Sequence, residues 1–170
     1  MKTLILGGRV IDPANKVDGY YNLLLENGKV AWVGTDCPAA DRIIEAAGKI
    51  VVPGFIDIHM HEDPVENGKI NQCIFPMMLR QGVTTAVGGN CGGNVHNPVE
   101  YLKIVDRDGA AVNVALFAGH EYFRIAAGAA DIYGSSTEVQ RQEMEKNIRA
   151  ALAAGCVGVS FGLRYVPGAD

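Results

Sequence analysis

The chain has 170 residues, of which 48% are hydrophobic and 20% charged, and its formal net charge is −4. This composition is typical of a globular protein and excludes intrinsic disorder and collagen-like repeats. The sequence has no apolar run of ~18 residues, no leader resembling a signal peptide and no basic cluster of the kind that binds phosphates. We therefore expect a cytoplasmic protein that binds neither nucleic acid nor a membrane.

Residues 1–50 predict a small β module. Two short extended segments, 23–26 and 29–33, flank Asn27-Gly28, a pair that favours the positive φ angles of a type I′ hairpin turn. A further extended segment is expected at 42–45. The module contains no group of titratable side chains that indicates chemistry.

From residue 51 onward the sequence alternates between expected strands and expected helices. Residues 50–58 predict a first buried strand, and residues 70–81 a helix that begins or kinks near Pro76 and stops before Gly82. Residues 83–88 predict the second strand. Asn97 followed by Pro98 is typical of a helix start, so we expect a helix from there to about residue 107.

The alternation continues to the end of the chain. Residues 112–118 and 157–161 predict a third and a fourth strand. The intervening helix is expected to begin at Ser135, which has capping-box spacing to Glu138, and to stop at Gly155. Long crossovers imply parallel strands, and three architectures fit: a four-stranded open sheet, a Rossmann-like sheet or part of a (β/α)8 barrel. No glycine-rich nucleotide-binding motif follows a strand, which disfavours the nucleotide-binding versions.

Candidate metal ligands follow the first two strands of this region. His59 and His61 lie at the carboxyl end of the first expected strand, where alternation places them on the face of Asp57. Cys91 follows the second strand within a glycine-rich loop. The carboxyl ends of parallel strands meet, and two imidazoles with a thiolate suit zinc. The competing interpretation is two solvent-exposed histidines and a small core cysteine.

Other polar residues are candidates for contact with a ligand. His120 ends the third strand and is either a site residue or a histidine bonded to backbone. Asp63 either orients a ligand or is solvated, and Tyr165 follows the fourth strand, where it would meet a carboxylate substrate. The fourth strand contains no lysine, so a carbamylated lysine bridging two metals is excluded there. The remaining cysteines are expected to be structural: Cys37, Cys73 and Cys156.

Several motifs carry a family resemblance. The segment 52–61, VPGFIDIHMH, resembles the first-strand signature of the amidohydrolase superfamily. The segments 82–85 (GVTT), 89–92 (GNCG) and 158–168 (GVSFGLRYVPG), with Gly119-His120 and Arg124, are similar to the narrower N-acyl-D-amino-acid deacylase (D-aminoacylase) group. The resemblance implies an α/β fold: a small N-terminal β-sandwich part, 1–50, followed in 51–170 by the first half, about four β/α units, of a TIM barrel.

The resemblance also implies a function: zinc-dependent hydrolysis of N-acyl-D-amino acids to a carboxylate and a D-amino acid. One or two Zn²⁺ ions would be held by His59, His61 and Cys91, with Cys91 in place of a carboxylated lysine. Asp63, His120 and Tyr165 would contact the substrate. Two alternatives remain: a cyclic-amide hydrolase of the hydantoinase or dihydroorotase type, and a non-catalytic fragment that binds metal or a partner.

The expected barrel is incomplete. A full (β/α)8 barrel takes ~200 residues or more, and 120 residues (170 minus 50) follow the β module. The later histidine ligands and the aspartate base of the family have no counterpart here. We therefore expect an N-terminal portion that is inactive alone. Its open sheet edges and apolar face predict self-association or pairing with a complementary chain.

Overall fold

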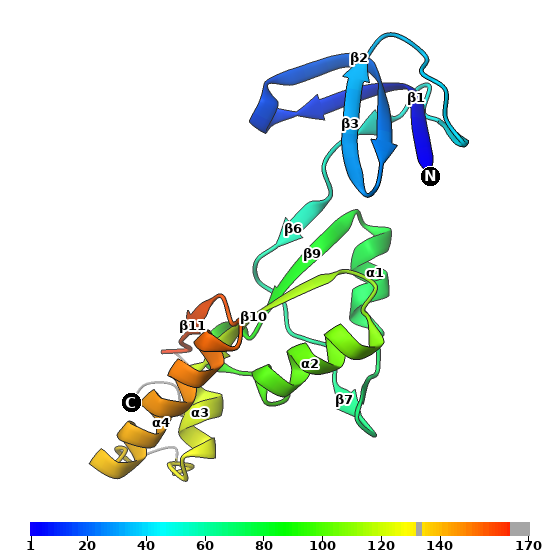
Figure 1. The fold of residues 1–170 in the computed structure, drawn as a ribbon. Helices are drawn as coiled ribbons and strands as arrows, with labels where there is room; N and C mark the ends of the chain where they lie inside the picture. Colours follow the sequence, from blue (N-terminus) through cyan, green and yellow to red (C-terminus); the bar gives the residue numbers. More distant parts are fainter. Residues whose placement is uncertain (132–133, 164–170) are drawn as a thin grey trace. The chain divides into compact units, whose positions relative to one another are not determined.

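The computed structural model describes residues 1–131 and 134–163, which form two compact units, Met1–Pro53 and Gly54–Asp170 (Figure 1). The first unit is rich in strands, and the second carries a parallel sheet covered by helices. The expected fold class, an α/β chain with a β module and a half-barrel sheet, is confirmed. Among the described helices, none has both the length and the apolar character needed to cross a bilayer.

The first unit is built around one long strand. Strand β1 (Lys2–Asp12) pairs antiparallel with β2 (Val17–Glu26), which pairs antiparallel with β3 (Lys29–Gly34). On the other side, β4 (Arg42–Glu45) and the short β5 (Ile50–Val51) run parallel to β1. A short 3-10 turn, η1 (Pro13–Asn15), joins β1 to β2. The buried hydrophobic residues of the unit come from β1, from β2 and from the turn after β4: Leu4, Val10, Leu23, Leu24 and Ala46.

The expected hairpin turn is confirmed. Asn27 and Gly28 join β2 to β3, and both have positive φ angles, 52° and 73°. These are the angles of a type I′ turn, whose twist matches that of the flanking strands. Strand β1, which pairs with the first strand of this hairpin, continues through a bulge between Ile5 and Gly8.

The second unit contains a four-stranded parallel sheet in the order β11-β10-β9-β6. The strands are β6 (Phe55–Asp57), β9 (Val83–Gly88), β10 (Asn113–Gly119) and β11 (Gly158–Ser160). Strands consecutive in this series are neighbours in the sheet, as in the opening half of a barrel. All four carboxyl ends therefore lie at the same edge.

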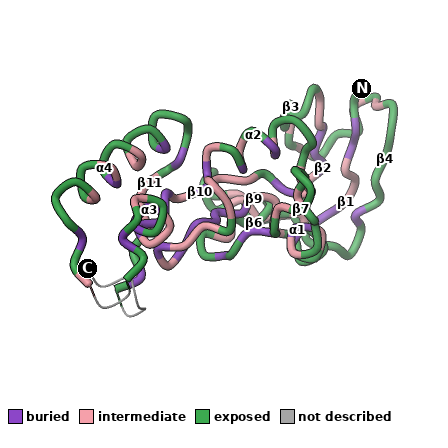
Figure 2. Tube along the Cα trace, turned by 90° about the horizontal axis from the view of Figure 1, so that it is seen from below, coloured by how far each residue is buried: buried purple, intermediate pink, exposed green. Residues whose placement is uncertain are grey.

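Helices connect these strands and cover one face of the sheet. Helix α1 (Ile74–Arg80) packs on β9, while α2 (Pro98–Asp108) and α4 (Glu138–Ala153) pack on β10. A short helix, α3 (His120–Ala126), follows β10 directly, and a small hairpin, β7 (Val65–Glu66) with β8 (Lys69–Ile70), precedes α1. Figure 2 shows the buried residues on the strands and on the inner sides of the helices, with the outer turns of α4 exposed.

The core of this unit lies between the helices and the sheet. Phe75 and Tyr101 come from α1 and α2, Leu116 and Ala118 from β10, and Ala151 from α4, and none of these side chains is exposed. Burial of this apolar surface contributes about 25 cal/mol per Å² and holds the layers together.

Several expectations about local structure were wrong. The expected helix 70–81 is shorter, α1 (Ile74–Arg80), because Ile70 belongs to the hairpin of β7 and β8. The expected strand 50–58 is split, because Pro53 has no N–H to donate: β5 pairs within the first unit and β6 within the second. The segment is also not buried, since β6 is an edge strand whose Ile56 is 64% exposed. Helix α4 is capped by Thr137, whose hydroxyl accepts from the N–H of Gln140, and not by Ser135.

Candidate metal centre

The three expected metal ligands converge at the carboxyl edge of the parallel sheet. His59 and His61 follow β6, and Cys91 lies in the 3-10 turn η2 (Asn90–Gly92) that follows β9. The ligand atoms of the three side chains all lie within 4.8 Å of one another. Both histidines are exposed and Cys91 is half-buried, so the cluster opens to solvent.

The histidines reach this arrangement in a different way from the one expected. Strand β6 ends at Asp57, and the chain bends over the next two residues, where the N–H of His59 donates to Asp57 Oδ1 at 2.9 Å. Strict strand alternation therefore does not bring His59 and His61 together. The bend does so, and it places their rings edge to face with centroids 6.2 Å apart.

The spacing of two ligand atoms fits a zinc ion. His59 Nε2 and Cys91 Sγ are 3.4 Å apart. A tetrahedral zinc with Zn–S of ~2.3 Å and Zn–N of ~2.0–2.1 Å places neighbouring sulfur and nitrogen ligands about 3.5 Å apart. Without a metal, the same two atoms share a hydrogen bond. Two imidazoles and a thiolate are also ligands that zinc prefers, so both geometry and donor chemistry fit this metal.

Cys91 is presented by an unusual backbone conformation. Its φ angle is 59°, in the left-handed region that non-glycine residues adopt at a cost of roughly 1–2 kcal/mol. Neighbouring glycines make the loop possible: a Cβ on Gly119 would lie 2.4 Å from the carbonyl oxygen of Gly92. The close approach of the loop to the end of β10 therefore requires a glycine at position 119.

The loop is also tied to the last described strand. The N–H of Gly92 donates to Ser160 Oγ at 3.0 Å, and that hydroxyl in turn donates to the carbonyl oxygen of Gly89. A single serine at the end of β11 thus bonds to both sides of Cys91. Ser160 was not identified from the sequence, where its place in an apolar strand gave no signal of this contact.

Asp63, two residues after His61, is fully buried rather than solvated. Its carboxylate accepts hydrogen bonds from the N–H groups of Cys73 (3.0 Å), Ile74 (2.7 Å) and Phe75 (3.0 Å), at the start of α1. Burial alone would raise the pKa of Asp63, but the hydrogen bonds from Phe75, Ile74 and Cys73 outweigh it and lower the pKa below its ordinary value. The expected contact with substrate stays a prediction, and the structure adds an anchoring role.

The hydroxyl of Tyr101 completes this anchor. Tyr101 is fully buried in α2, and its hydroxyl donates to the carbonyl oxygen of Asp63 at 3.0 Å. Burial, followed by the nearby charges of Glu62 and Asp63, raises the pKa of Tyr101 well above its ordinary value. The hydroxyl therefore stays protonated and remains a donor. The segment that follows the two histidines is thus fixed from both α1 and α2.

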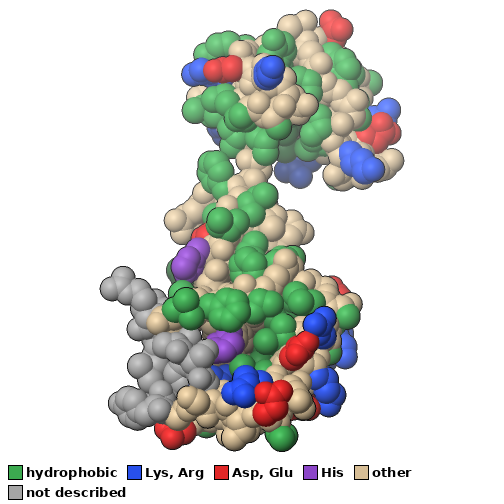
Figure 3. Space-filling model, turned by 90° about the vertical axis from the view of Figure 1, so that its left-hand side faces the viewer, with side chains coloured by type: hydrophobic (Ala, Val, Ile, Leu, Met, Phe, Trp, Pro, Cys, Tyr) green, Lys and Arg blue, Asp and Glu red, His purple; other side chains and the backbone are tan. Residues whose placement is uncertain are grey.

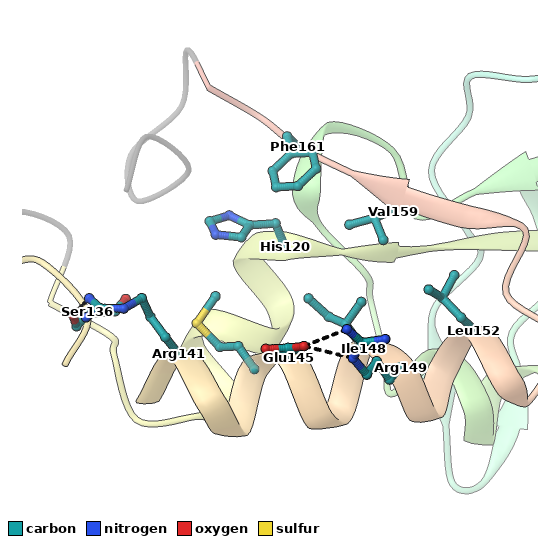
Figure 4. Close-up of a pocket in the computed structure, with 10 residues that line it drawn as sticks. His120, Ser136, Arg141, Glu145, Ile148, Arg149, Leu152, Val159 and Phe161 are labelled. Carbon is teal, nitrogen blue, oxygen red and sulfur yellow. Dashed lines mark hydrogen bonds and ion pairs between the residues drawn. The ribbon is translucent and has the colours of Figure 1, made fainter. Parts of the chain in front are cut away.

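His120 lies in a separate pocket of about 510 Å³ between α4 and β11 (Figure 4). Its ring stacks at a tilt on Phe161, with centroids 5.1 Å apart, and both rings lie above α4. None of the three candidate metal ligands is among the described residues that line this pocket. The lining residues come mostly from α4 and include Met144, Ile148 and Leu152. Because the candidate metal ligands do not line this pocket, the substrate contact expected of His120 stays a prediction. Tyr165 lies outside the described residues.

The sequence of the chain is similar to those of two groups of curated hydrolases. No family model matches the chain. A curated D-aminoacylase from Alcaligenes xylosoxydans xylosoxydans is 31% identical over 98% of this chain and 38% of its own length. A curated dihydroorotase from Geobacter metallireducens is 33% identical over 94% of this chain and 36% of its own length.

A solved structure of a related deacylase is also similar to this chain. The crystal structure of N-acyl-D-glutamate deacylase from Bordetella bronchiseptica, complexed with zinc and a phosphonate inhibitor, aligns with a TM-score of 0.84 at 31% identity. The alignment covers 98% of this chain and 39% of that one. The chain thus spans about two-fifths of the length of the relatives it matches. In sequence and in fold, it corresponds to the N-terminal portion of the D-aminoacylase group of the amidohydrolase superfamily.

Proposed function

We propose that His59, His61 and Cys91 bind zinc in a site that hydrolyses the amide bond of N-acyl-D-amino acids. The observation that carries the proposal is the convergence of two imidazoles and a thiolate within 4.8 Å, at the sheet edge where barrel enzymes bind substrates. The correspondence with the D-aminoacylase group supports the substrate class. The site would hold one or two zinc ions.

The chemistry divides between the metal and the chain. A bound zinc ion supplies Lewis-acid polarisation of the scissile carbonyl. His59 and His61 provide neutral ligands and Cys91 an anionic one, which matches the donor set of known zinc sites. Asp63 holds the loop behind the histidines in place through its bonds to α1. The cluster opens to solvent, so we expect a substrate to approach the ligands from that side.

The general base is proposed to come from outside the described cluster. No carboxylate of the described residues joins the three candidate ligands in this cluster. Because the chain spans about two-fifths of its relatives' length, we propose that activity requires the remaining part of the fold. The chain alone is then expected to bind zinc without turnover.

Metal titration of the purified chain tests the site. Zinc binding measured by calorimetry and elemental analysis is expected to be specific in the parent chain and lost in Cys91→Ala and His59→Ala. Cys37→Ala and His96→Ala, which change a cysteine and a histidine outside the cluster, serve as matched controls and should bind as the parent does. Equal binding by all five proteins would overturn the assignment.

A cyclic-amide hydrolase is the second candidate function, because dihydroorotases also match most of the chain. The two candidates separate in an assay that supplies the missing part of the fold, with an N-acetyl-D-amino acid, its L enantiomer and dihydroorotate as substrates. Cleavage of the D enantiomer supports the deacylase. Cleavage of dihydroorotate alone supports the alternative.

Self-association or pairing with a complementary chain also remains our proposal. Large hydrophobic side chains are exposed on and beside the two edge strands of the second unit: Phe55, Ile56, Ile58, Val157 and Phe161. Figure 3 shows hydrophobic side chains gathered in a band across one face of this unit. Sedimentation of the chain alone should show dimers or larger species, and a monodisperse monomer would contradict the proposal.

A further inference from the structure

Two asparagine side chains connect the loop that carries the histidines to the loop that carries the cysteine. The first is Asn90, which is 8% exposed and immediately precedes Cys91. Its Nδ2 donates to the carbonyl oxygen of Met60 at 3.1 Å and to that of Val87 at 2.7 Å. Since Met60 stands between His59 and His61, this amide reaches from one ligand loop to the middle of the other.

The second is Asn94, three residues after Cys91. Its Nδ2 donates to Glu62 Oε1 at 3.1 Å and to the carbonyl oxygen of Phe117 at 3.1 Å. Its Oδ1 accepts the N–H of Gly119 at 2.8 Å. Asn94 therefore links Glu62, the residue after His61, to the carboxyl end of β10.

The two bridges join residues that flank the candidate ligands in the sequence. Asn90 and Asn94 flank Cys91 in the sequence, and their partners Met60 and Glu62 flank His61. Both partners are buried, 7% and 4% exposed, so water does not readily compete for these hydrogen bonds. The spacing between His61 and Cys91 is thus fixed by bonds that involve no ligand atom.

We propose that Asn90 and Asn94 are positioning residues that hold the histidine pair and Cys91 at metal-binding distance before any metal is bound. This positioning role rests on the proposed function, because it matters only if the three ligands bind zinc. A site assembled in advance loses less conformational entropy on binding, and partners of this kind are worth about 10–100-fold in metal affinity. Neutral amides suit the role, because they donate to carbonyl and carboxylate oxygens without adding a charge beside the ligands.

Cobalt binding tests the proposal, since Co²⁺ bound to a thiolate gives a charge-transfer absorption band. Asn90→Ala and Asn94→Ala are expected to bind Co²⁺ about 10–100-fold more weakly and with an altered band. Asn113→Ala is the matched control: its amide donates to the carbonyl oxygen of Thr84 at 2.9 Å, at the opposite end of the sheet. This control should bind Co²⁺ as the parent does.

A variant pair at Glu62 separates positioning from folding. Glu62→Gln keeps an oxygen that can accept from Asn94 and should retain near-parental affinity and absorption. Glu62→Leu has similar bulk but no acceptor and should weaken Co²⁺ binding as Asn94→Ala does. If the alanine variants fail to fold, this pair carries the comparison.

A measurement without metal distinguishes this proposal from the proposed function. In the metal-free parent, the short separation of the Cys91 and His59 side chains predicts nuclear Overhauser contacts between their protons. These contacts should persist in Asn113→Ala and disappear in Asn90→Ala and Asn94→Ala. Their persistence in the asparagine variants would overturn the positioning role. A parent chain that shows the contacts but binds no Co²⁺ would instead overturn the metal site alone.

Discussion

His59 Nε2 lies 3.4 Å from Cys91 Sγ, although the two residues are 32 positions apart in the sequence. They follow two neighbouring parallel strands, β6 and β9, so the fold and not the local sequence brings them together. The consequences of this arrangement, and of the structure that supports it, can be measured by substitution.

Cys91→Gly is expected to give a more stable protein than Cys91→Ala, by about 1 kcal/mol. Glycine adopts the left-handed φ of 59° without the strain that a Cβ introduces. Chemical denaturation of the metal-free chain measures the difference. Cys156, which has no positive φ angle, is the control, and there Ala should be more stable than Gly. If the Ala variant is more stable than the Gly variant at both positions, residue 91 is not strained.

Asp63→Ala is expected to destabilise the chain by roughly 2–3 kcal/mol. The change leaves three N–H groups at the start of α1 without their buried acceptor. Urea unfolding followed by circular dichroism measures the loss. Asp106→Ala, an exposed position on α2, should change stability by less than about 0.5 kcal/mol. Equal effects at the two positions would contradict the anchoring role of Asp63.

Thr137→Ala is expected to lower stability by about 1 kcal/mol, because it removes the side chain that caps α4. Ser135→Ala should have almost no effect. Thermal unfolding of the two variants compares them directly. A larger loss at Ser135 would restore the helix start expected from the sequence.

Arg124→Lys is expected to cost roughly 2–4 kcal/mol in spite of the retained charge. The Arg124 side chain is 1% exposed, and its guanidinium donates to the carbonyl oxygens of Ala129, Asp131 and Gly134. The single lysine nitrogen cannot reproduce the planar spread of these donors, so buried and part-buried carbonyls lose their bonds to the guanidinium. Arg80→Lys, at an exposed position, is the control for denaturation. Tolerance of both changes would show that the guanidinium geometry is not needed.

Local patterns predicted much of the second unit. The Asn97-Pro98 pair gave the start of α2, because a capping side chain and a proline act within one turn of the helix. Strand β9 agrees with the expected 83–88, where β-branched residues end at glycines. The His-x-His pair and Cys91 were identified as partners because parallel strands share a carboxyl edge.

Features that depend on distant contacts were not predicted. Helix α3 begins at His120, and its N-cap residue, Gly119, has no side chain to cap it, so the sequence carries no start signal for this helix. A Gly-Gly pair is typical of a strand end, but strand β1 continues through Gly7, which lies in a bulge and has a φ angle of 75°. The hydrogen bonds of Asn90 and Asn94 to the histidine loop were also not predicted. Asparagines beside glycines are typical of any loop, and only the folded chain shows their partners.

The left-handed backbone at residue 91 also limits how the metal preference of the proposed site can be redesigned. Aspartate tolerates this conformation better than most residues, whereas β-branched side chains do not. Cys91→Asp would therefore replace a soft sulfur ligand by a hard oxygen ligand in the same loop. Such a change should move selectivity away from zinc and toward manganese or magnesium. The backbone conformation at residue 91 thus limits which ligand side chains can stand there, and with them which metals the proposed site can prefer.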